Sequence, residues 1–237
     1  MVKVFIDPGH GGSDPGAVAN GLYEKDLVLT IAKRIRDLLI SEFRNIEVRM
    51  SRETDRFIEL SERARLANAW GADYFVSIHI NSGGGTGFES FIYIGRTSGS
   101  VTAQIVVHDE VMKEIGVVDR GKKSANYSVL RNTSMPSILT ETLFIDNQAD
   151  ALKLKNPAFL EKAAQGHVNG IAKLFNLQRI GGNRVNNEPS PWAKTSWEKA
   201  SKMEVFPGLM LIDGTDPQDA VTREQLIVIL DRLGLIN

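Results

Sequence analysis

Cysteine is absent from this 237-residue chain, which excludes disulfide bonds, a thiol nucleophile and thiolate metal ligands. Histidine is scarce, with four copies, so any transition metal has to be held by imidazoles together with carboxylates. Neither sign of charge dominates, because 28 Lys and Arg stand against 29 Asp and Glu, and this balance argues against a nucleic-acid partner held by electrostatics. No apolar run approaches the ~20 residues of a membrane span. The composition therefore indicates a globular protein with no membrane span.

Strand-like and helix-like patterns alternate along the first three quarters of the chain. Alternation of this kind predicts an α/β fold with a twisted, mostly parallel central sheet flanked by helices. The apolar spacing predicts strands at residues 2–6, 47–50, 74–78, 88–94 and 138–140, and helices at 27–43, 60–70, 101–115 and 157–175.

The composition changes after this region. We expect a catalytic domain at residues 1–177, a breaker-rich linker at 178–191, and a small helical module at 192–237. The module holds two helical patterns around a turn at 213–215. A core of this size is marginal, so the module should dock on another surface or self-associate.

Four separate sequence blocks carry residues suited to chemistry, and each lies at a strand end or a helix start. They contain His10, Glu24, His79 and Glu141. Loops at the carboxyl ends of parallel strands converge on one crevice, so we expect these side chains to meet at one edge of the sheet. Two imidazoles and one carboxylate would form a three-ligand zinc site with a position open for water, and the remaining carboxylate would transfer protons.

Each residue also has a simpler interpretation. A histidine at a strand end is commonly a hydrogen-bonded structural residue, and a glutamate in a first helical turn commonly complements the helix dipole. Residues 7–12, Asp-Pro-Gly-His-Gly-Gly, could form only a tight turn or a phosphate cradle, although they lack the Lys-Ser/Thr of a P-loop. The shared location of the four blocks favours the metal site.

The order of these motifs resembles the zinc-dependent N-acetylmuramoyl-L-alanine amidases, and more narrowly the amidase-3 family of cell-wall hydrolases found in autolysins, sporulation enzymes and phage endolysins. The resemblance covers residues 2–177 and is carried by Asp-Pro-Gly-His-Gly-Gly (7–12), Gly-x-x-Glu-Lys-Asp (21–26), Ser-Ile-His-x-Asn (77–81), Val-Leu-Arg-Asn-Thr (129–133), Met-Pro (135–136) and Glu-Thr-x-Phe-x-x-Asn (141–147).

The resemblance implies particular roles. His10, Glu24 and His79 match the family's zinc (Zn2+) ligands, and Glu141 matches its catalytic glutamate. The substrate implied is peptidoglycan, cleaved at the amide between N-acetylmuramic acid and L-alanine of the stem peptide. The chain departs from the family at Leu143, where glycine is common, and a leucine there is expected to narrow the cleft.

Two further residues are candidates for substrate binding. Asn81 could orient the metal site or the substrate, or act as a structural residue at a strand end. Arg131 lies in a segment rich in small and polar residues, predicted to be a loop, where it could contact the peptide or the muramyl group or be solvated.

Other polar residues near these blocks are assigned supporting roles. Asp7 is expected to orient the His10 side chain and not to bind the metal itself. His108 is predicted to lie on the surface, and His167 to be structural. Arg63 and Asn68 are expected to tether a helix to loops and to have no chemical role.

The C-terminal segment resembles a single S-layer homology repeat. Such repeats recognise secondary cell-wall polymer, usually as three copies, and this chain has one. Polymer binding and a merely docking or dimerising helical pair both stay open. No secretory leader pattern precedes residues 2–6, so we expect release by lysis or another route, or a leader that this chain lacks.

Two other functions remain to be separated from the amidase. One is a zinc peptidase or deacylase acting on a different substrate. The other is a wall-binding protein with an inactive amidase-like domain.

Overall fold

The computed structural model describes residues 1–95, 97–180, 204–206 and 209–210. The chain divides into two units, Met1–Ile180 and Gly181–Asn237. In the second unit, β9 (Glu204–Phe206) pairs with β10 (Leu209–Met210) in antiparallel fashion. The rest of the predicted C-terminal module, and most of the predicted linker, lie outside the described residues.

The first unit is built on one six-stranded sheet with the order β4-β1-β5-β8-β6-β7. Neighbouring strands run parallel except β6 and β8, which are antiparallel. The predicted α/β class with a mostly parallel sheet is therefore confirmed. The strands are β1 (Val2–Pro8), β4 (Ile46–Met50), β5 (Tyr74–Asn81), β6 (Phe88–Tyr93), β7 (Asp119–Ala125) and β8 (Ser137–Phe144).

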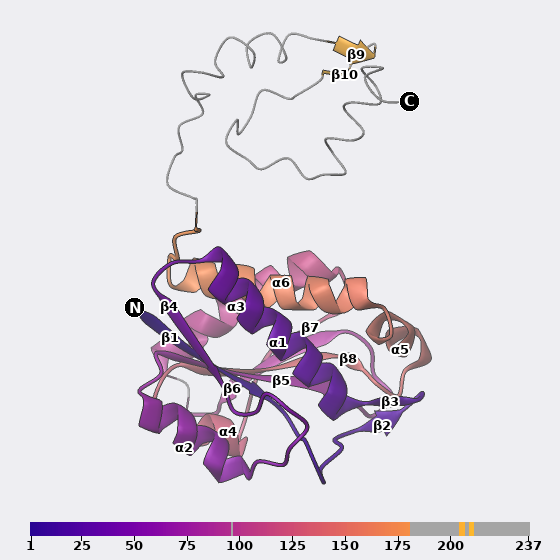
Figure 1. Cartoon of the computed structure of the whole chain (residues 1–237). Helices are drawn as coiled ribbons and strands as arrows, with labels where there is room; N and C mark the ends of the chain where they lie inside the picture. Colours follow the sequence, from indigo (N-terminus) through magenta and orange to yellow (C-terminus); the bar gives the residue numbers. More distant parts are fainter. Residues whose placement is uncertain (96, 181–203, 207–208, 211–237) are drawn as a thin grey trace. The chain divides into compact units, whose positions relative to one another are not determined.

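Helices cover both faces of this sheet, as Figure 1 shows. One face packs against α1 (Glu24–Glu42), α3 (Ser98–Ile115) and α6 (Pro157–Leu174), and the other packs against α2 (Leu60–Trp70) and α4 (Ser128–Arg131). A further short helix, α5 (Gln148–Leu154), follows β8. The sheet is consequently buried on both sides, and this explains why its central strands are near-continuous apolar runs.

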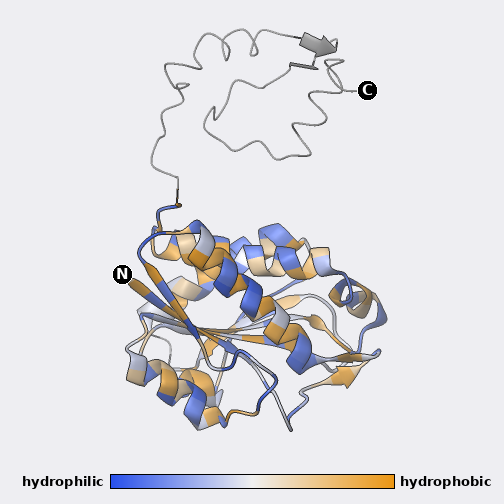
Figure 2. Ribbon diagram, in the orientation of Figure 1, coloured by the Kyte–Doolittle hydropathy of each residue, from blue (hydrophilic) through white to orange (hydrophobic). Residues whose placement is uncertain are grey.

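Alternation along the central strands divides the core into two layers. Val4 and Ile6 of β1 face α1, α3 and α6, whereas Phe5 between them faces α2 and α4. Figure 2 shows the hydrophobic strands enclosed by helices whose hydrophilic sides point outward. The larger core cluster lies under α1, α3 and α6, so this side provides most of the apolar burial that stabilises the domain.

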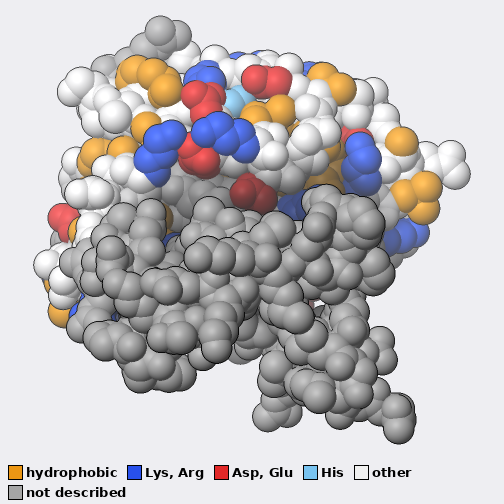
Figure 3. All heavy atoms as spheres, turned by 90° about the horizontal axis from the view of Figure 1, so that it is seen from above, with side chains coloured by type: hydrophobic (Ala, Val, Ile, Leu, Met, Phe, Trp, Pro, Cys, Tyr) orange, Lys and Arg blue, Asp and Glu red, His pale blue; other side chains and the backbone are white. Residues whose placement is uncertain are grey.

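The surface formed by α1, α3 and α6 carries charges of both signs. Where it is visible in Figure 3, blue and red side chains lie beside one another. Arg34 of α1 donates to Glu161 of α6 at 2.6 Å and 2.7 Å, and Lys173 of α6 pairs with Glu110 of α3. These exposed pairs contribute little stability but make the face polar. No helix among the described residues is long and apolar enough to cross a membrane.

Local sequence signals explain several helix boundaries. Asn156 caps α6 by accepting a hydrogen bond from the Ala158 amide at 3.0 Å, and α2 stops at Gly71, whose φ of 66° is left-handed. Ahead of α1, β2 (Val18–Ala19) and β3 (Leu22–Tyr23) form a hairpin through Asn20 and Gly21, both with positive φ. This Asn-Gly turn leads the chain directly into Glu24, the first residue of α1.

Two predictions about the fold were wrong. Residues 119–125 form the edge strand β7, and 128–131 form the short helix α4, although the segment around Arg131, between Gly121 and Met135, was predicted as a loop. His108 is fully buried instead of lying on the surface, with Nδ1 at 2.8 Å from Ser90 Oγ and Nε2 at 2.9 Å from Asp119 Oδ1. The structural prediction for His167 is confirmed, because it is buried against Thr140.

Candidate metal and catalytic site

The loop after β1 is held in place by two buried arginines. Arg63 of α2 donates to the carbonyl oxygens of Pro8 and His10 at 2.8 Å and 2.7 Å, and Arg52 donates to that of Gly9 at 2.7 Å. His10 has a left-handed φ of 57°, which is unusual for a residue with a side chain. These donors stabilise that conformation, so the prediction that Arg63 tethers a helix to a loop is confirmed. Asn68 likewise bonds the backbone at Asn132 and Ser134.

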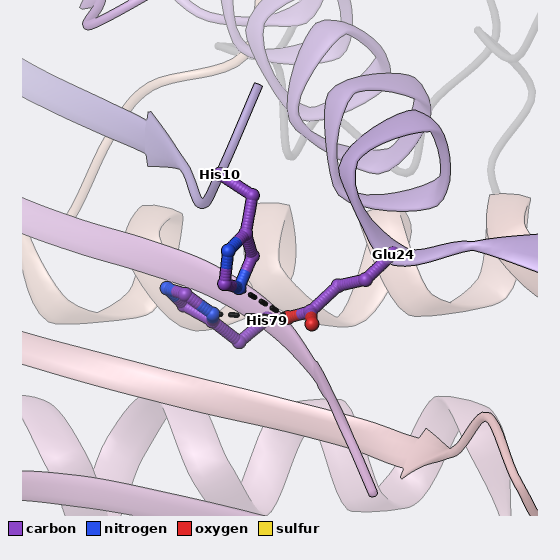
Figure 4. Close-up of side chains that lie close together, drawn as sticks. All are labelled: His10, Glu24 and His79. Atoms are coloured by element: carbon purple, nitrogen blue, oxygen red, sulfur yellow. Dashed lines mark hydrogen bonds and ion pairs between the residues drawn. The ribbon is translucent and has the colours of Figure 1, made fainter. Parts of the chain in front are cut away.

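Three side chains from distant parts of the chain converge beside this loop (Figure 4). His10 follows β1, Glu24 begins α1, and His79 lies near the end of β5. Glu24 Oε1 lies 3.1 Å from His10 Nε2 and 3.0 Å from His79 Nδ1. One ligand atom from each residue lies within 4.8 Å of the others. The predicted meeting of these residues at one sheet edge is thus observed.

Backbone amides fix the position of the Glu24 carboxylate. Oε1 accepts a hydrogen bond from Ile80 N at 3.0 Å, and Oε2 accepts one from Ala17 N at 2.9 Å. Burial opposes the charged form of Glu24, but the bonds from His10 and His79 outweigh burial and lower its pKa. Burial likewise lowers the pKa of each imidazole, and the bonds to Glu24 outweigh this and raise it. Glu24 is therefore held in its charged form, which is the form of a carboxylate that can bind a cation.

His10 is oriented by Asp14 and not by Asp7, so the prediction for Asp7 was wrong. His10 Nδ1 lies 2.8 Å from Asp14 Oδ2, which directs Nε2 toward Glu24. Asp7 is fully buried instead and accepts hydrogen bonds from Arg63, from Ser51 Oγ at 2.6 Å and from Ser77 Oγ at 2.8 Å. Asp7 thus stabilises the buried polar contacts beneath the loop that follows β1.

Glu141 lies beside this cluster on β8, where its Cα pairs with that of His79. Its Oε2 is buried and has no hydrogen-bond partner among the described residues. Burial raises the pKa of Glu141 to about 7, and the nearby Glu24 charge adds to the rise while His79 opposes it. A carboxyl group with a pKa near neutrality can both accept and donate a proton.

All four residues line a single pocket of about 320 Å³. Apolar and aromatic side chains also line the pocket, namely Leu60 of α2, Tyr127 just before α4, Val129 of α4 and Leu139 of β8. A few titratable groups thus share one concave site with apolar side chains, which is the usual composition of an enzyme active site.

The two predicted substrate-binding residues lie in different places. Asn81 lines the pocket, where its Nδ2 donates to Glu89 Oε1 and its Oδ1 accepts from Ser82 N, both at 2.8 Å. Arg131 is exposed at the end of α4, bonds Asn126 Oδ1 at 2.6 Å and is not part of the pocket lining. The structure therefore brings Asn81, but not Arg131, to the site.

Sequence reasoning missed three residues around the pocket. Asp14 could have been found from its i,i+4 spacing to His10. Glu89 is buried, and its Cα pairs with that of Glu141. The alternation of residues along its strand could have shown that it lies on a covered face of the sheet. Tyr127 lines the pocket and packs against Phe91 with ring centroids 5.3 Å apart, and no sequence pattern pointed to it.

Leu143 does not narrow the pocket, contrary to expectation. Between Glu141 and Phe144, β8 carries one more residue than β5 carries between His79 and Asn81, so the strand bulges there. Leu143 takes a left-handed φ of 66° in this bulge, which explains why glycine suits the position. Its side chain is fully buried in the larger core cluster, on the opposite side of the sheet from the pocket.

Comparison with protein-family models gives a match over residues 4–173 to Amidase_3, described as N-acetylmuramoyl-L-alanine amidase. Among curated proteins, the chain is 53% identical over 179 residues to N-acetylmuramoyl-L-alanine amidase CwlM of Bacillus licheniformis, covering 76% of this chain and 71% of the relative. It is 49% identical over 195 residues to the endolysin of Bacillus phage SPP1, covering 79% of this chain and 72% of the relative.

Comparison with solved structures also finds N-acetylmuramoyl-L-alanine amidases. The N-acetylmuramoyl-L-alanine amidase from Clostridium difficile 630 superposes with a TM-score of 0.72 at 37% sequence identity. The superposition covers 74% of this chain and 97% of the other.

Proposed function

Since the chain belongs to the Amidase_3 family of N-acetylmuramoyl-L-alanine amidases, we propose that its His10–Glu24–His79 cluster holds zinc and that Glu141 transfers the protons. The family consists of peptidoglycan hydrolases, and the chain acts at the cell wall on the amide between N-acetylmuramic acid and L-alanine. The metal and the residue roles are the proposed part. The observation that carries them is the convergence of the three ligand candidates beside a buried, unpartnered carboxylate oxygen.

The donor set suits zinc. His10, Glu24 and His79 would supply the two imidazoles and one carboxylate that hold zinc in three-ligand catalytic sites, where the metal would act on water or substrate. Asp14 supplies the hydrogen-bond partner that a zinc-ligating histidine commonly has. When bound, zinc supplies a Lewis acid that polarises the scissile carbonyl and makes water a better nucleophile.

Glu141 is placed to perform both proton transfers. Its carboxylate accepts a proton from the attacking water and then delivers that proton to the leaving nitrogen of L-alanine. Because Oε2 has no competing hydrogen bond from a described residue, it is free to take this role. Asn81 supports the site by fixing the end of β5, and we keep Arg131 as a candidate contact for substrate outside the pocket.

Metal analysis combined with identification of the freed amine tests this proposal. We expect about one zinc ion per chain, and digestion of purified muropeptides should release peptides with a new amino-terminal L-alanine. Cleavage between amino acids of the stem peptide would instead identify a peptidase. Zinc binding without any cleavage would identify an inactive wall-binding protein, and a purified, folded protein that retained no zinc would refute the metal assignment.

For the C-terminal segment we propose a wall-binding role, resting on its resemblance to an S-layer homology repeat. Deleting residues 182–237 should weaken sedimentation with intact walls containing secondary polymer while leaving turnover of small soluble muropeptides unchanged. Walls stripped of that polymer are the control and should bind both forms equally. Equal sedimentation of the two forms with intact walls would contradict the proposal.

A further inference from the structure

A row of ionisable side chains continues across the sheet beyond Glu141. The Cα of Glu141 pairs with that of His79 on one side and with that of Glu89 on the other. Residues directly opposite one another on paired strands project from the same face of the sheet. His79, Glu141 and Glu89 therefore form one polar row on the face that contains the pocket.

Glu89 connects this row to two cations on the edge strand. Glu89 is 5% exposed, and its carboxylate accepts hydrogen bonds from Asn81 Nδ2 at 2.8 Å, Arg120 Nε at 2.8 Å and Lys123 Nζ at 2.5 Å. Burial opposes ionisation of Glu89, but the bonds from Lys123 and Arg120 outweigh it and lower the pKa. The Glu89 carboxylate thus neutralises one of its two cationic partners. Arg120 and Lys123 together therefore keep one positive charge in excess over Glu89.

The Arg120 guanidinium is held in a defined orientation. Its Cζ lies 4.7 Å from the centroid of the Phe144 ring, and its Nε is bonded to Glu89. No other hydrogen bond from this guanidinium reaches a described residue, so its two terminal NH2 groups are available. The side chains of Arg120 and Lys123 are 33% and 39% exposed. A fixed guanidinium with two open donors is suited to a carboxylate.

The arrangement places these cations on the side of Glu141 away from the metal-ligand candidates. Strand order runs from β5 with His79, through β8 with Glu141 and β6 with Glu89, to β7 with both cations. Adjacent strands lie about 4.8 Å apart, so β7 is roughly 10 Å from β8. The amine that receives its proton from Glu141 belongs to the peptide half of the substrate. Extended peptide advances about 3.3 Å per residue, so a carboxylate shortly after L-alanine can reach the cations.

We propose that Arg120 and Lys123 form a subsite for a free carboxylate on the stem-peptide residue that directly follows the L-alanine whose amide is cleaved. Glu89 positions both cations and links them to Asn81 at the pocket. The subsite rests on the proposed function, because it assumes that Glu141 protonates the L-alanine nitrogen. It makes Arg120 a specificity residue for the acidic form of the peptide.

Two matched substrates test the subsite. They are muramoyl-L-alanyl peptides that differ only in a carboxylate or a carboxamide on the residue after L-alanine. We expect wild-type kcat/KM to be about 10-fold higher for the carboxylate, and Arg120→Gln to remove most of this preference through KM. Lys122→Gln is the matched control, since Lys122 pairs with Asp109 on the opposite face of the same strand, and it should keep the preference.

The outcomes separate this subsite from the proposed function. Equal wild-type activity on the two substrates would overturn the subsite without any variant being needed, and an equal loss on both in Arg120→Gln would show a purely structural role. No cleavage of either substrate by the zinc-loaded protein would count against the proposed function instead. A preference that disappears in Arg120→Gln and survives in Lys122→Gln supports the subsite.

Discussion

Replacing Glu141 with glutamine is expected to reduce amide hydrolysis by about 10³-fold while zinc binding stays nearly intact. Glutamine has the same shape as glutamate but cannot take a proton from water at neutral pH. The loss should appear in kcat, because the ligand cluster and the pocket walls are unchanged. Stability should change little, since Glu141 Oε2 makes no hydrogen bond to a described residue that the variant could lose. Turnover of purified muropeptides and zinc content of the same sample provide the measurement.

A neighbouring residue supplies the control for this variant. Thr142 follows Glu141, and its buried Oγ1 likewise has no hydrogen-bond partner among the described residues. Because side chains alternate along a strand, Thr142 projects from the opposite face of β8. Thr142→Val should therefore keep full activity and raise the free energy of unfolding by about 1 kcal/mol, because it removes a buried unsatisfied hydroxyl. Activity of Glu141→Gln within a few-fold of wild type would show that another group is the base.

Replacing Gly9 with alanine is expected to lower zinc affinity by about 100-fold. A Cβ at this position would lie 2.3 Å from Cε1, 2.5 Å from Nε2 and 2.8 Å from Nδ1 of His79. These separations are far inside van der Waals contact, so the His79 ring has to leave the position in which its Nδ1 lies 3.0 Å from Glu24 Oε1. Competition with a chelator of known affinity measures the change, and hydrolysis at limiting zinc should fall in parallel.

Gly21→Ala distinguishes this steric effect from general backbone strain. Gly21 has a left-handed φ of 74°, and a Cβ there would meet nothing within 4 Å. Alanine at Gly21 should therefore cost about 1 kcal/mol of stability and leave zinc affinity unchanged. Were Gly9→Ala to bind zinc as tightly as wild type, His79 could not be held in the position described here.

The central layers of the fold could be predicted because local signals and packing agree there. The run at 74–78 is apolar throughout, as a strand covered on both faces requires, and Asn156 with Pro157 marks a helix start. The convergence of His10, Glu24 and His79 followed from the same topology, because strand ends of a parallel sheet meet at one edge.

The features that could not be predicted from the sequence depend on tertiary contacts. Strand β7 is an edge strand with a polar sequence, so neither periodicity nor hydrophobicity revealed it. His108 has polar neighbours in sequence, yet it is buried because Ser90 and Asp119 satisfy both ring nitrogens. Asp7 precedes His10 closely, but its side chain points toward Arg63 and Ser51, a direction that spacing alone does not determine.

The bulge at Leu143 determines how firmly β8, the strand that carries Glu141, is anchored. A glycine in the same left-handed conformation would avoid a steric cost of about 1–2 kcal/mol, but it would leave the core beneath empty. Leucine accepts that cost and recovers roughly 2 kcal/mol by burying its side chain beneath α1, α3 and α6. Leu143 thereby anchors the end of β8 to the core on the face of the sheet away from the pocket. Changes in helix packing remote from the pocket can therefore reach Glu141, the proposed proton-transfer group.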